Sequence, residues 1–508
     1  ALNNLVGTFA TIQAAVTAAA NGQTIRVADG TYSETVTVDK DVSILGANVG
    51  IAHDGTRVAE TSVTGGFHVT ADGATLDGLT VNDGASMSGE LAGVFVQADN
   101  VTVTNSVFTR AGDVDASRGV VTAINDATGL AVSNNSFSGW ATGTYLNPGS
   151  SASVSGNAFT ANFVGLSVDD PDGVNIASNA FTNNSFEQVG VGAMDASEDL
   201  AAQIASSNTF SGTAPQVSIY PLNGGAQSIV GTTYADVLNA DANAVTFTGG
   251  AGNDVINGGT GNDTAVYAGV RADYMVGTTL NSAGRVTAFT SVTDTNAGNG
   301  DEGSDTLSGI DLVTFADRTL DLSASVQLFD ALNNLVGTFA TIQAAVTAAA
   351  NGQTIRVADG TYSETVTVDK DVSILGANVG IAHDGTRVAE TSVTGGFHVT
   401  ADGATLDGLT VNDGASMSGE LAGVFVQADN VTVTNSVFTR TGDVDGDGSR
   451  GVVTAISDAT NLAVSHNAFS GWATGTYLNP GSNASVSGNA FTGNFVGLSV
   501  DDPDGVNI

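Results

Sequence analysis

The chain has 508 residues, of which 42% are hydrophobic and 13% charged, and 52 Asp and Glu against 13 Lys and Arg give a formal net charge of -39. So acidic a chain excludes binding to nucleic acid or to an anionic membrane through a basic surface, and cations are its natural partners. There is no cysteine and no apolar run long enough to cross a membrane, so neither disulfides nor bilayer insertion are expected. The 65 glycines, with many Thr, Val, Asn and Ser residues, predict an all-β protein of short strands and tight turns.

The first predicted element is a helix at residues 8–23, TFATIQAAVTAAANGQ, which carries one apolar face. Thr8 is its candidate N-cap, and Gly22 in the pair Asn-Gly ends it. Alternating strands follow over residues 24–48. We expect this helix to cap the end of a β-structure, because exposed strand edges invite uncontrolled pairing.

A repeat of 22 residues follows, and residues 119–140, 141–162 and 163–184 align without gaps. The aligned columns are Phe137, Phe159 and Phe181; Asn135, Asn157 and Asn179; and Val132, Val154 and Ile176. This period and its strand-like alternation predict a parallel β-solenoid, in which each column becomes a ladder from coil to coil. We interpret the Asn column as an inward ladder that satisfies backbone groups of the turns, and a polar binding track is the alternative.

The same segments carry a resemblance to a known fold. The cap TIQAAVTAAANGQTIRVADGTY, followed by strands such as VSILGAN and VTVTNSVFTR, resembles right-handed parallel β-helix proteins of the pectate-lyase-like superfamily. The resemblance covers about residues 8–215 and again 338–508. It implies a right-handed parallel β-helix, and it leaves the activity open.

The whole block occurs twice. Residues 1–110 recur letter for letter as 331–440, and the match continues to residue 508 with a few substitutions and a two-residue insertion. The sequence therefore predicts four segments and resembles a piece of a longer tandem array. These segments are a β-helix at 1–222, a β-roll at 223–266, a β-rich connector at 267–330 and a second, truncated β-helix at 331–508.

Between the copies the period changes to nine residues. The blocks 231–239, 249–257 and 258–266 follow or approach G-G-x-G-x-D-x-U-x, in which glycines allow a tight turn and carbonyl and carboxylate oxygens face a cation. This resembles the RTX calcium-binding β-roll, which implies Ca²⁺ as the cofactor, and the alternative is turns that bind nothing. Two nonapeptides make one coil, so the first two aspartates should lie on one side of the roll. The candidate ligand residues are Asp236, Gly249, Gly252, Asn253, Asp254, Gly261, Asn262 and Asp263.

A second calcium candidate occurs only in the later copy. There, GDVDGDG places Asp443, Asp445 and Asp447 in a D-x-D-x-D-G pattern that resembles calcium loops of the EF-hand and dockerin kind. The pattern lacks the Glu at the twelfth position, and a plain acidic loop is the alternative.

No catalytic motif of the epimerases or polygalacturonases of this fold is present, so no residue is assigned as catalytic. The best candidate clusters are Asp113, Asp115 and Arg118 on one side, and Asp169, Asp170 and Asp172 with Tyr145 on the other. Solvated acidic turns are the alternative interpretation of both.

Near-identical blocks in series favour a structural role, because the length of a solenoid scales with its copy number. The sequence therefore predicts a non-enzymatic, calcium-dependent protein of a filament, surface layer or adhesin stalk, secreted by a bacterium and located outside the cell or at its surface. Copies of itself are the expected partners, with a surface polysaccharide as a further candidate. Two alternatives stay open: a β-helix lyase or epimerase acting on an acidic polysaccharide, and a non-catalytic carbohydrate-binding module.

Overall fold

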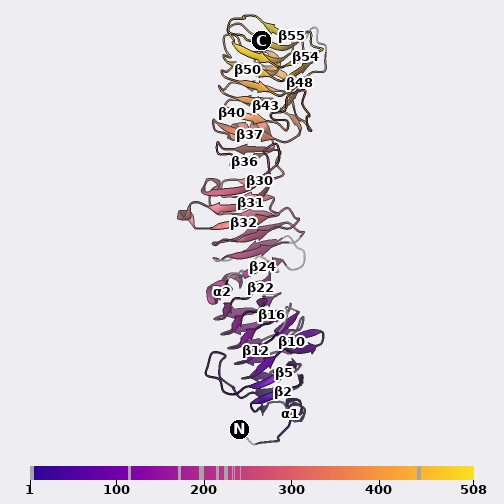
Figure 1. The fold of residues 1–508 in the computed structure, drawn as a ribbon, viewed down its shortest axis with the longest axis vertical. Coiled ribbons are helices and arrows are strands. Elements are labelled where there is room, and N and C mark those ends of the chain that lie inside the picture. Colours follow the sequence, from indigo (N-terminus) through magenta and orange to yellow (C-terminus); the bar gives the residue numbers. More distant parts are fainter. Residues whose placement is uncertain are drawn as a thin grey trace. The chain divides into compact units, whose positions relative to one another are not determined.

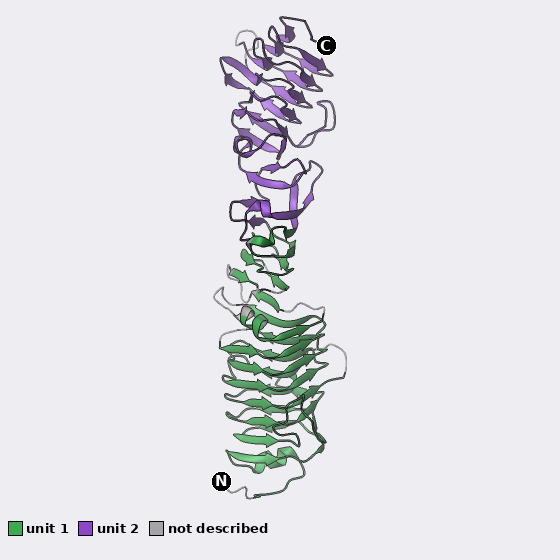
Figure 2. Cartoon of the chain, turned by 90° about the vertical axis from the view of Figure 1, so that its left-hand side faces the viewer, with its two compact units in different colours: residues 1–266, 292–310 green, residues 267–291, 311–508 purple. Residues whose placement is uncertain are grey.

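The structure is a computed structural model that describes residues 5–111, 116–169, 173–193, 200–212, 217–221, 227–231, 233, 235–240, 242–442 and 448–508. The chain divides into two compact units, one of residues 1–266 and 292–310 and one of residues 267–291 and 311–508 (Figure 2). Among the described residues, no helix is both long enough and apolar enough to cross a membrane.

The first unit begins as a stack of coils, each of which contributes one strand to each of three parallel sheets (Figure 1). The first sheet consists of β1 (Gln23–Arg26), β4 (Val42–Leu45), β7 (Thr75–Asp77), β11 (Thr102–Thr104), β14 (Leu130–Ser133), β17 (Ala152–Ser155) and β20 (Val174–Ala177). The second sheet consists of β2 (Gly30–Ser33), β5 (Thr61–Thr64), β8 (Thr80–Asn82), β12 (Val107–Thr109), β15 (Ser136–Ser138), β18 (Ala158–Thr160), β21 (Ala180–Thr182) and β23 (Thr209–Ser211).

The third sheet is the longest in this unit. It consists of β3 (Val36–Val38), β6 (Phe67–Val69), β10 (Glu90–Val96), β13 (Ser117–Thr122), β16 (Thr142–Leu146), β19 (Val164–Val168), β22 (Glu187–Ala193), β24 (Val217–Pro221), β26 (Asp236–Asn239), β28 (Val255–Asn257) and β32 (Ser304–Ser308). A short strand, β9 (Ala85–Met87), pairs antiparallel with β10. Because β24 pairs with β26, the sheet of the β-helix continues without a break into the nine-residue repeats.

The predicted columns are stacked ladders inside the solenoid. Phe137, Phe159 and Phe181 are at most 1% exposed, and the ring centroids of neighbouring coils are 4.9 Å apart. This distance is close to the spacing of strands in a sheet, so each ring repeats with the backbone. The ladder extends to Phe108 and to Phe210, at centroid distances of 4.7 and 5.3 Å.

The Asn side chains of the column form hydrogen bonds with backbone groups of the turns, as expected. The backbone N–H of Asn135 donates to Oδ1 of Asn157 at 2.8 Å, and that of Asn157 donates to Oδ1 of Asn179 at 2.9 Å. Each Nδ2 donates to a carbonyl oxygen, that of Val103 for the first of these residues and that of Val132 for the second. These buried amides therefore replace the hydrogen bonds that turn residues would otherwise lack.

The capping helix is shorter than predicted. Helix α1 (Ile12–Ala18) has Thr11 as its N-cap in place of Thr8, and the Thr11 hydroxyl accepts a backbone hydrogen bond at 3.1 Å. Both carboxylate oxygens of Glu34 accept from backbone N–H groups of the first turn at 2.8 and 3.0 Å, and Lys40 Nζ donates to two carbonyls near the C-terminal end. These charges complement the helix dipole, which explains how seven residues hold as a helix.

A helix that the sequence analysis did not predict, α2 (Leu200–Ser207), follows β22 in the first unit and packs against β20. Ile204 is fully buried, and Gln203 Nε2 donates to the carbonyl of Ile176 at 2.9 Å. The helix thus covers the last strand of the first sheet.

Three further strands of the first unit form the other side of the roll: β25 (Gln227–Val230), β27 (Val245–Thr248) and β29 (Thr264–Val266). Apolar side chains of these strands point inward, and Ile229, Phe247 and Ala265 are at most 2% exposed. Two nonapeptides make one coil, since Val237 pairs with Val255 across 18 residues.

The second unit contains β33 (Leu312–Thr314), β34 (Thr319–Asp321), most of the strands β30 (Tyr274–Leu280) and β31 (Val286–Asp294), and the second copy. Its first sheet consists of β36 (Leu335–Phe339), β35 (Val326–Phe329), β37 (Gln353–Val357), β40 (Val372–Leu375), β43 (Thr405–Asp407), β47 (Thr432–Thr434), β50 (Leu462–Ser465) and β53 (Ala484–Ser487). The 3₁₀ turns are η1 (Arg271–Asp273) in this unit and η2 (Ala297–Asn299) in the first.

The capping helix of the second copy is α3 (Ile342–Ala348). The second sheet of this copy consists of β38 (Gly360–Ser363), β41 (Thr391–Thr394), β44 (Thr410–Asn412), β48 (Val437–Thr439), β51 (Ala468–Ser470) and β54 (Ala490–Thr492). Its third sheet consists of β39 (Val366–Val368), β42 (Phe397–Val399), β46 (Glu420–Val426), β49 (Arg450–Thr454), β52 (Thr474–Leu478) and β55 (Val496–Val500), with β45 (Ala415–Met417) antiparallel to β46.

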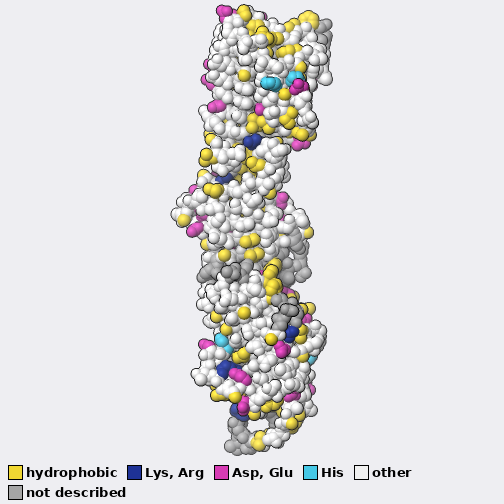
Figure 3. All heavy atoms as spheres, viewed as in Figure 1, with side chains coloured by type: hydrophobic (Ala, Val, Ile, Leu, Met, Phe, Trp, Pro, Cys, Tyr) yellow, Lys and Arg dark blue, Asp and Glu magenta, His cyan; other side chains and the backbone are white. Residues whose placement is uncertain are grey.

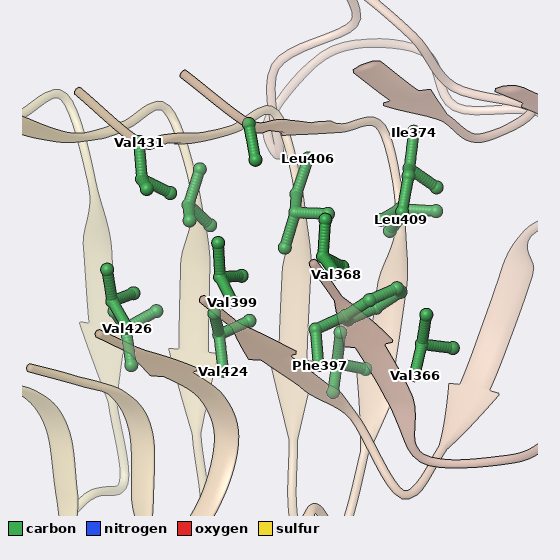
Figure 4. Close-up of a cluster of buried hydrophobic side chains, with 14 of the residues drawn as sticks. Val366, Val368, Ile374, Phe397, Val399, Leu406, Leu409, Val424, Val426 and Val431 are labelled. Carbon is green, nitrogen blue, oxygen red and sulfur yellow. The ribbon is translucent and has the colours of Figure 1, made fainter. Parts of the chain in front are cut away.

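Figure 4 shows how the sheets of the second copy bury their apolar side chains against one another. Phe397, Val424 and Leu406 project from different strands into one space and are at most 1% exposed. The predicted all-β fold of two β-helix copies with capping helices and a β-roll is therefore confirmed. The division into four segments with the boundaries given above stays a prediction.

Candidate functional site

Three aspartates stand in a column in the third sheet, at the start of β26, just before β28 and within β32. The backbone N–H of Asp236 donates to Oδ1 of Asp254 at 2.9 Å, and the N–H of Asp254 donates to Oδ1 of Asp305 at 2.9 Å. All three residues are only 1% exposed. Asp236 and Asp254 thus lie on one side of the roll, one coil apart, as their spacing predicts.

The carboxylate of Asp254 is the best described member of this column. Its Oδ2 atom is buried and has no hydrogen-bond partner among the described residues. Burial is the main cause that raises the pKa of Asp254 to about 7, the hydrogen bond from the Asp236 backbone opposes the shift, and the nearby charge of Asp236 adds to it. A cation beside this oxygen would hold the carboxylate in its ionised form.

Glycines leave space next to these carboxylates. A Cβ atom on Gly249 would lie 2.3 Å from Oδ2 of Asp254, and one on Gly231 would lie 2.9 Å from Oδ2 of Asp236 and 2.2 Å from the carbonyl oxygen of Gly249. A carboxylate and a backbone carbonyl therefore line the same small space. Calcium takes six to eight oxygen ligands, and carboxylate and carbonyl oxygens are the kinds that it prefers, so these residues fit Ca²⁺.

Side chains alone do not complete a metal site. Within the described ranges, no group of three or more His, Asp or Glu residues is placed to hold a metal ion. Backbone carbonyls of the glycine turns must therefore supply part of the coordination, which is how the nine-residue motif is expected to work.

The remaining candidate ligands lie in the turns before β28 and β29: Gly249, Gly252, Asn253, Gly261, Asn262 and Asp263. Asp263 stands on the other side of the roll, where its Oδ1 accepts from the backbone N–H of Val245 at 2.8 Å. Oδ1 of Asn253 accepts from the N–H of Ser304 at 2.8 Å, which ties the turn to β32. Asn262 is exposed.

Sequence reasoning missed Asp305 as a member of the column. A signal was present, because G-S-D-T-L-S at residues 303–308 repeats the pattern of G-N-D-V-I-N at 252–257. The intervening insertion hid the nine-residue spacing. Several other predicted residues lie outside the described residues: Asp443, Asp445 and Asp447 of the second calcium candidate, and Asp113, Asp115, Asp170 and Asp172 of the acidic clusters.

A second cluster lies on the outer face of the third sheet and joins one or more residues from each of the two candidate clusters of the sequence analysis. The guanidinium carbon of Arg118 in β13 lies 4.7 Å from the ring centroid of Tyr145 in β16. The hydroxyl of Tyr145 donates to Oδ2 of Asp169, just after β19, at 2.5 Å. Burial and this hydrogen bond raise the pKa of Tyr145 well above its usual range, so the phenol keeps its proton at neutral pH. We call Glu90, Arg118, Tyr145 and Asp169 the outer-face cluster.

Glu90 is the member that sequence reasoning did not find. It begins β10 and forms an ion pair with Nη1 of Arg118, and the two side chains are 31% and 23% exposed. The β9–β10 hairpin brings it there, and a hairpin inserted in a parallel coil left no periodic signal. Beside the cluster, Met87, Phe95 and Val121 are buried against Tyr145 in a small apolar group.

His68 lies on the same face, at the register position of Phe95 one strand away, and its ring stacks on Phe95 with centroids 5.3 Å apart. Its Nε2 is hydrogen-bonded to Oε1 of Gln97 at 2.5 Å. In the register of the sheet, His68 is three strands from Tyr145, or ~14 Å. His68 and Tyr145 therefore cannot act on the same bond.

The arrangement recurs in the second copy. Arg450 lies 4.6 Å over the ring of Tyr477, pairs with Glu420, and the Tyr477 hydroxyl donates to Oδ2 of Asp501 at 2.6 Å. These residues lie on both sides of the two-residue insertion that separates the copies. The geometry of the cluster is therefore the same in the two copies despite the insertion.

Comparison with known proteins agrees with this fold. The profile described as right handed beta helix region matches residues 65–235, and that of the RTX calcium-binding nonapeptide repeat matches residues 230–265. The residues of the roll therefore belong to a calcium-binding repeat, and such repeats are typical of secreted proteins. No curated protein matches the chain.

Two similar solved structures are alginate lyases. A PL6 alginate lyase in complex with a trisaccharide is 12% identical, with 87% of this chain and 84% of that chain covered and a TM-score of 0.26. The PL6 family alginate lyase AlyGC is 11% identical, with 96% of this chain and 87% of that chain covered and a TM-score of 0.24. At these values the likeness concerns the fold alone, so the roles of individual residues are argued from this chain.

The comparisons correct the main functional prediction. Four of the matching solved structures are alginate lyases, and neither they nor the family profiles point to a purely structural, non-enzymatic filament or stalk, so that prediction is not upheld. The cofactor prediction of Ca²⁺ is confirmed. The chain is a tandem right-handed parallel β-helix protein that carries an RTX-type calcium-binding repeat.

Proposed function

We propose that this chain is an extracellular, calcium-dependent β-helix enzyme that acts on an acidic polysaccharide, with the outer-face cluster as its reaction centre. The observation that carries the proposal is the contact of Arg118, Tyr145 and Asp169 on one outward face, repeated with the same geometry in the second copy. A cation, a protonated phenol and a carboxylate are the groups that an elimination on a uronate needs.

In that reaction a base removes the proton at C5, the bond between C4 and the glycosidic oxygen breaks, and a C4–C5 double bond forms. Arg118 would neutralise the uronate carboxylate, which makes the C5 proton more acidic. Tyr145 keeps its proton at neutral pH and would donate it to the leaving oxygen, and Asp169, its hydrogen-bond partner, would take up the C5 proton.

Calcium has two parts in this proposal. The Asp column of the roll would hold ions that stabilise the first unit, and further Ca²⁺ would reduce the repulsion between a chain of net charge -39 and a polyanion. On the face drawn in Figure 3, Lys and Arg side chains are sparse, so few basic groups offset this repulsion there. Extracellular calcium reaches the concentrations that such sites require, which supports a location outside the cell.

A second candidate function is polysaccharide binding without turnover. Arg118 is already paired with Glu90, and Tyr145 with Asp169, so a substrate would have to displace existing partners. The ring of His68, ~14 Å from Tyr145, fits a surface that contacts several sugar units along an extended chain.

The test uses the full chain with Ca²⁺ and either alginate or polygalacturonate. Elimination is followed by the ultraviolet absorbance of the new double bond, and binding by co-sedimentation with the polymer. The paired variant Tyr145→Phe with Tyr477→Phe should abolish the absorbance increase, whereas the control Tyr32→Phe with Tyr362→Phe should retain it. Binding without new absorbance would establish the second candidate, and neither signal with any acidic polysaccharide would refute both.

A further inference from the structure

The β9–β10 hairpin carries Glu90 on a part of the fold that lies outside the regular coils. β9 lies off the path of the third sheet and pairs antiparallel with β10, so that Met87 stands opposite Glu90. The neighbouring strand β13 pairs with β10 from Leu91 onward, and β6 pairs with it from Val94 onward. Glu90 is therefore placed where the hairpin extends beyond both neighbouring strands.

The hairpin is anchored by one side chain and exposed at its tip. Met87 is 4% exposed and packs with Val121 beside Tyr145. The two residues between the strands, Ser88 and Gly89, are exposed and have φ angles of 49° and 93°. Positive φ at both positions is typical of a tight two-residue turn. This turn holds the first residue of β10 beside the outer-face cluster.

The ion pair between Glu90 and Arg118 is partly open to solvent, with side chains 31% and 23% exposed. The pair of Arg57 with Glu60 in the same copy is built differently. Arg57 is 11% exposed, and its Nη1 also donates to two backbone carbonyls at 2.8 and 3.0 Å, which ties that pair into the fold. Partly exposed ion pairs contribute little to stability, so a competing carboxylate can displace Glu90 at small cost.

A uronate would present to Arg118 the same group that Glu90 presents, a carboxylate. We propose that Glu90 is a gate that mimics the substrate: without ligand its carboxylate occupies Arg118, and a uronate carboxylate displaces it on binding. This inference rests on the proposed function, because it takes Arg118 as the group that neutralises the uronate. A neutral sugar brings no carboxylate to exchange, so the gate selects acidic polysaccharides. Glu420 and Arg450 form the same pair in the second copy.

The test is the affinity of the full chain, with Ca²⁺, for hexamers of alginate and of polygalacturonate, measured by calorimetric titration. Glu90→Gln with Glu420→Gln keeps the shape of both side chains and removes their charge. This variant should bind a hexamer at least about threefold more tightly than the unchanged chain. The KM of turnover should fall to the same extent, whereas kcat should stay within about twofold. Neutral mannohexaose should bind no better to the variant than to the unchanged chain.

Two controls separate a gate from a general effect of charge. Asp54→Asn with Asp384→Asn removes the same charge at exposed loop residues and should leave the affinity unchanged. In a chain that carries Arg118→Ala and Arg450→Ala, the two Gln substitutions should give no gain, because the gate acts through the guanidinium group.

Each outcome decides between the gate and the proposed function. If the unchanged chain binds a hexamer and the Gln variant binds it equally or more weakly, the gate is overturned and the proposed function stands. A gain that persists without Arg118 and Arg450 would also overturn the gate, since it would reflect general repulsion. Binding by the Gln variant alone would support the gate. If neither protein binds either hexamer, the gate and the proposed function both fail.

Discussion

At the residue scale, Asp254 combines burial, a raised pKa and an oxygen that faces a space left by Gly249. Such a carboxylate is costly to bury unless a cation compensates it. Asp254→Asn preserves the shape and the hydrogen bond from the Asp236 backbone but removes the charge. We expect calcium affinity to fall at least about tenfold, measured by calorimetric titration. Asp54→Asn, at an exposed loop residue, is the control and should leave the titration unchanged.

Glu187 gives a prediction of the opposite kind, because no cation site accompanies its burial within the part of the chain that the structure describes. It is 5% exposed, and burial raises its pKa from the ordinary 4.5, against the effect of hydrogen bonds from Ser218 and Tyr220. The folded state therefore holds the proton more tightly than the unfolded state, and stability falls as the pH rises from 4.5 through the raised pKa. Glu187→Gln should raise the midpoint of thermal unfolding at neutral pH and have little effect below pH 4.5.

The contrasting variant is Glu60→Gln. Arg57 lowers the pKa of Glu60, chiefly through a side-chain hydrogen bond, so that this carboxylate stabilises the fold above its ordinary pKa. Its replacement should lower the unfolding midpoint at neutral pH, and the difference should vanish as the pH falls through the lowered pKa. Equal shifts of the unfolding midpoint in Glu187→Gln and Glu60→Gln would contradict the assignment of burial to Glu187 and of pairing with Arg57 to Glu60.

At the element scale, the phenylalanine ladder holds the coils in register. Phe159 is fully buried between Phe137 and Phe181. Phe159→Ala should cost about 3–5 kcal/mol of stability, since it removes a large side chain and leaves a cavity in a stacked core. Phe163→Ala, at a residue that is 36% exposed, should cost much less. Chemical denaturation of the two variants compares them, and similar losses would show that the ladder has no special role.

The sequence predicted these ladders because each coil repeats the same positions. The 22-residue alignment fixed which Phe and Asn residues stack, and the structure places Asn135 and Asn157 as expected. It could not predict α2, which replaces a strand where the repeat ends. Nor could it join Arg118 to Tyr145, because their contact depends on how much chain each turn takes up between neighbouring coils. Local periodicity therefore predicts the coils, but it predicts poorly which side chains of neighbouring coils come into contact where the turns differ in length.

At the scale of the whole molecule, calcium should stabilise one part of the chain selectively. The Asp column lies in the roll, whereas the coils that contain Phe137, Phe159 and Phe181 rely on Phe, Val and Asn ladders. Chelation should therefore remove hydrogen-exchange protection from residues 235–308 first and lower one unfolding transition in calorimetry. At a calcium concentration of 100 times Kd the ligand supplies about 2.7 kcal/mol. A uniform loss of protection over the whole chain would contradict this prediction.

The antiparallel pairing of β35 with β37 also has a consequence for how the chain folds. One polypeptide contains two strand segments of identical sequence with which β35 could pair, residues 23–27 and 353–357. Because the two segments are identical, the side-chain contacts of β35 cannot select between them. Chain connectivity does distinguish them. The loop closed by pairing with residues 353–357 is roughly a tenth as long as the loop closed by pairing with residues 23–27, and its lower closure entropy favours the near pairing by about 2 kcal/mol. Synthesis adds a bias the other way, since the first segment leaves the ribosome long before the second. Loop-closure entropy thus favours the correct pairing of β35, and the order of synthesis favours the incorrect one. Misassembly between repeats is the characteristic failure of chains duplicated in this way.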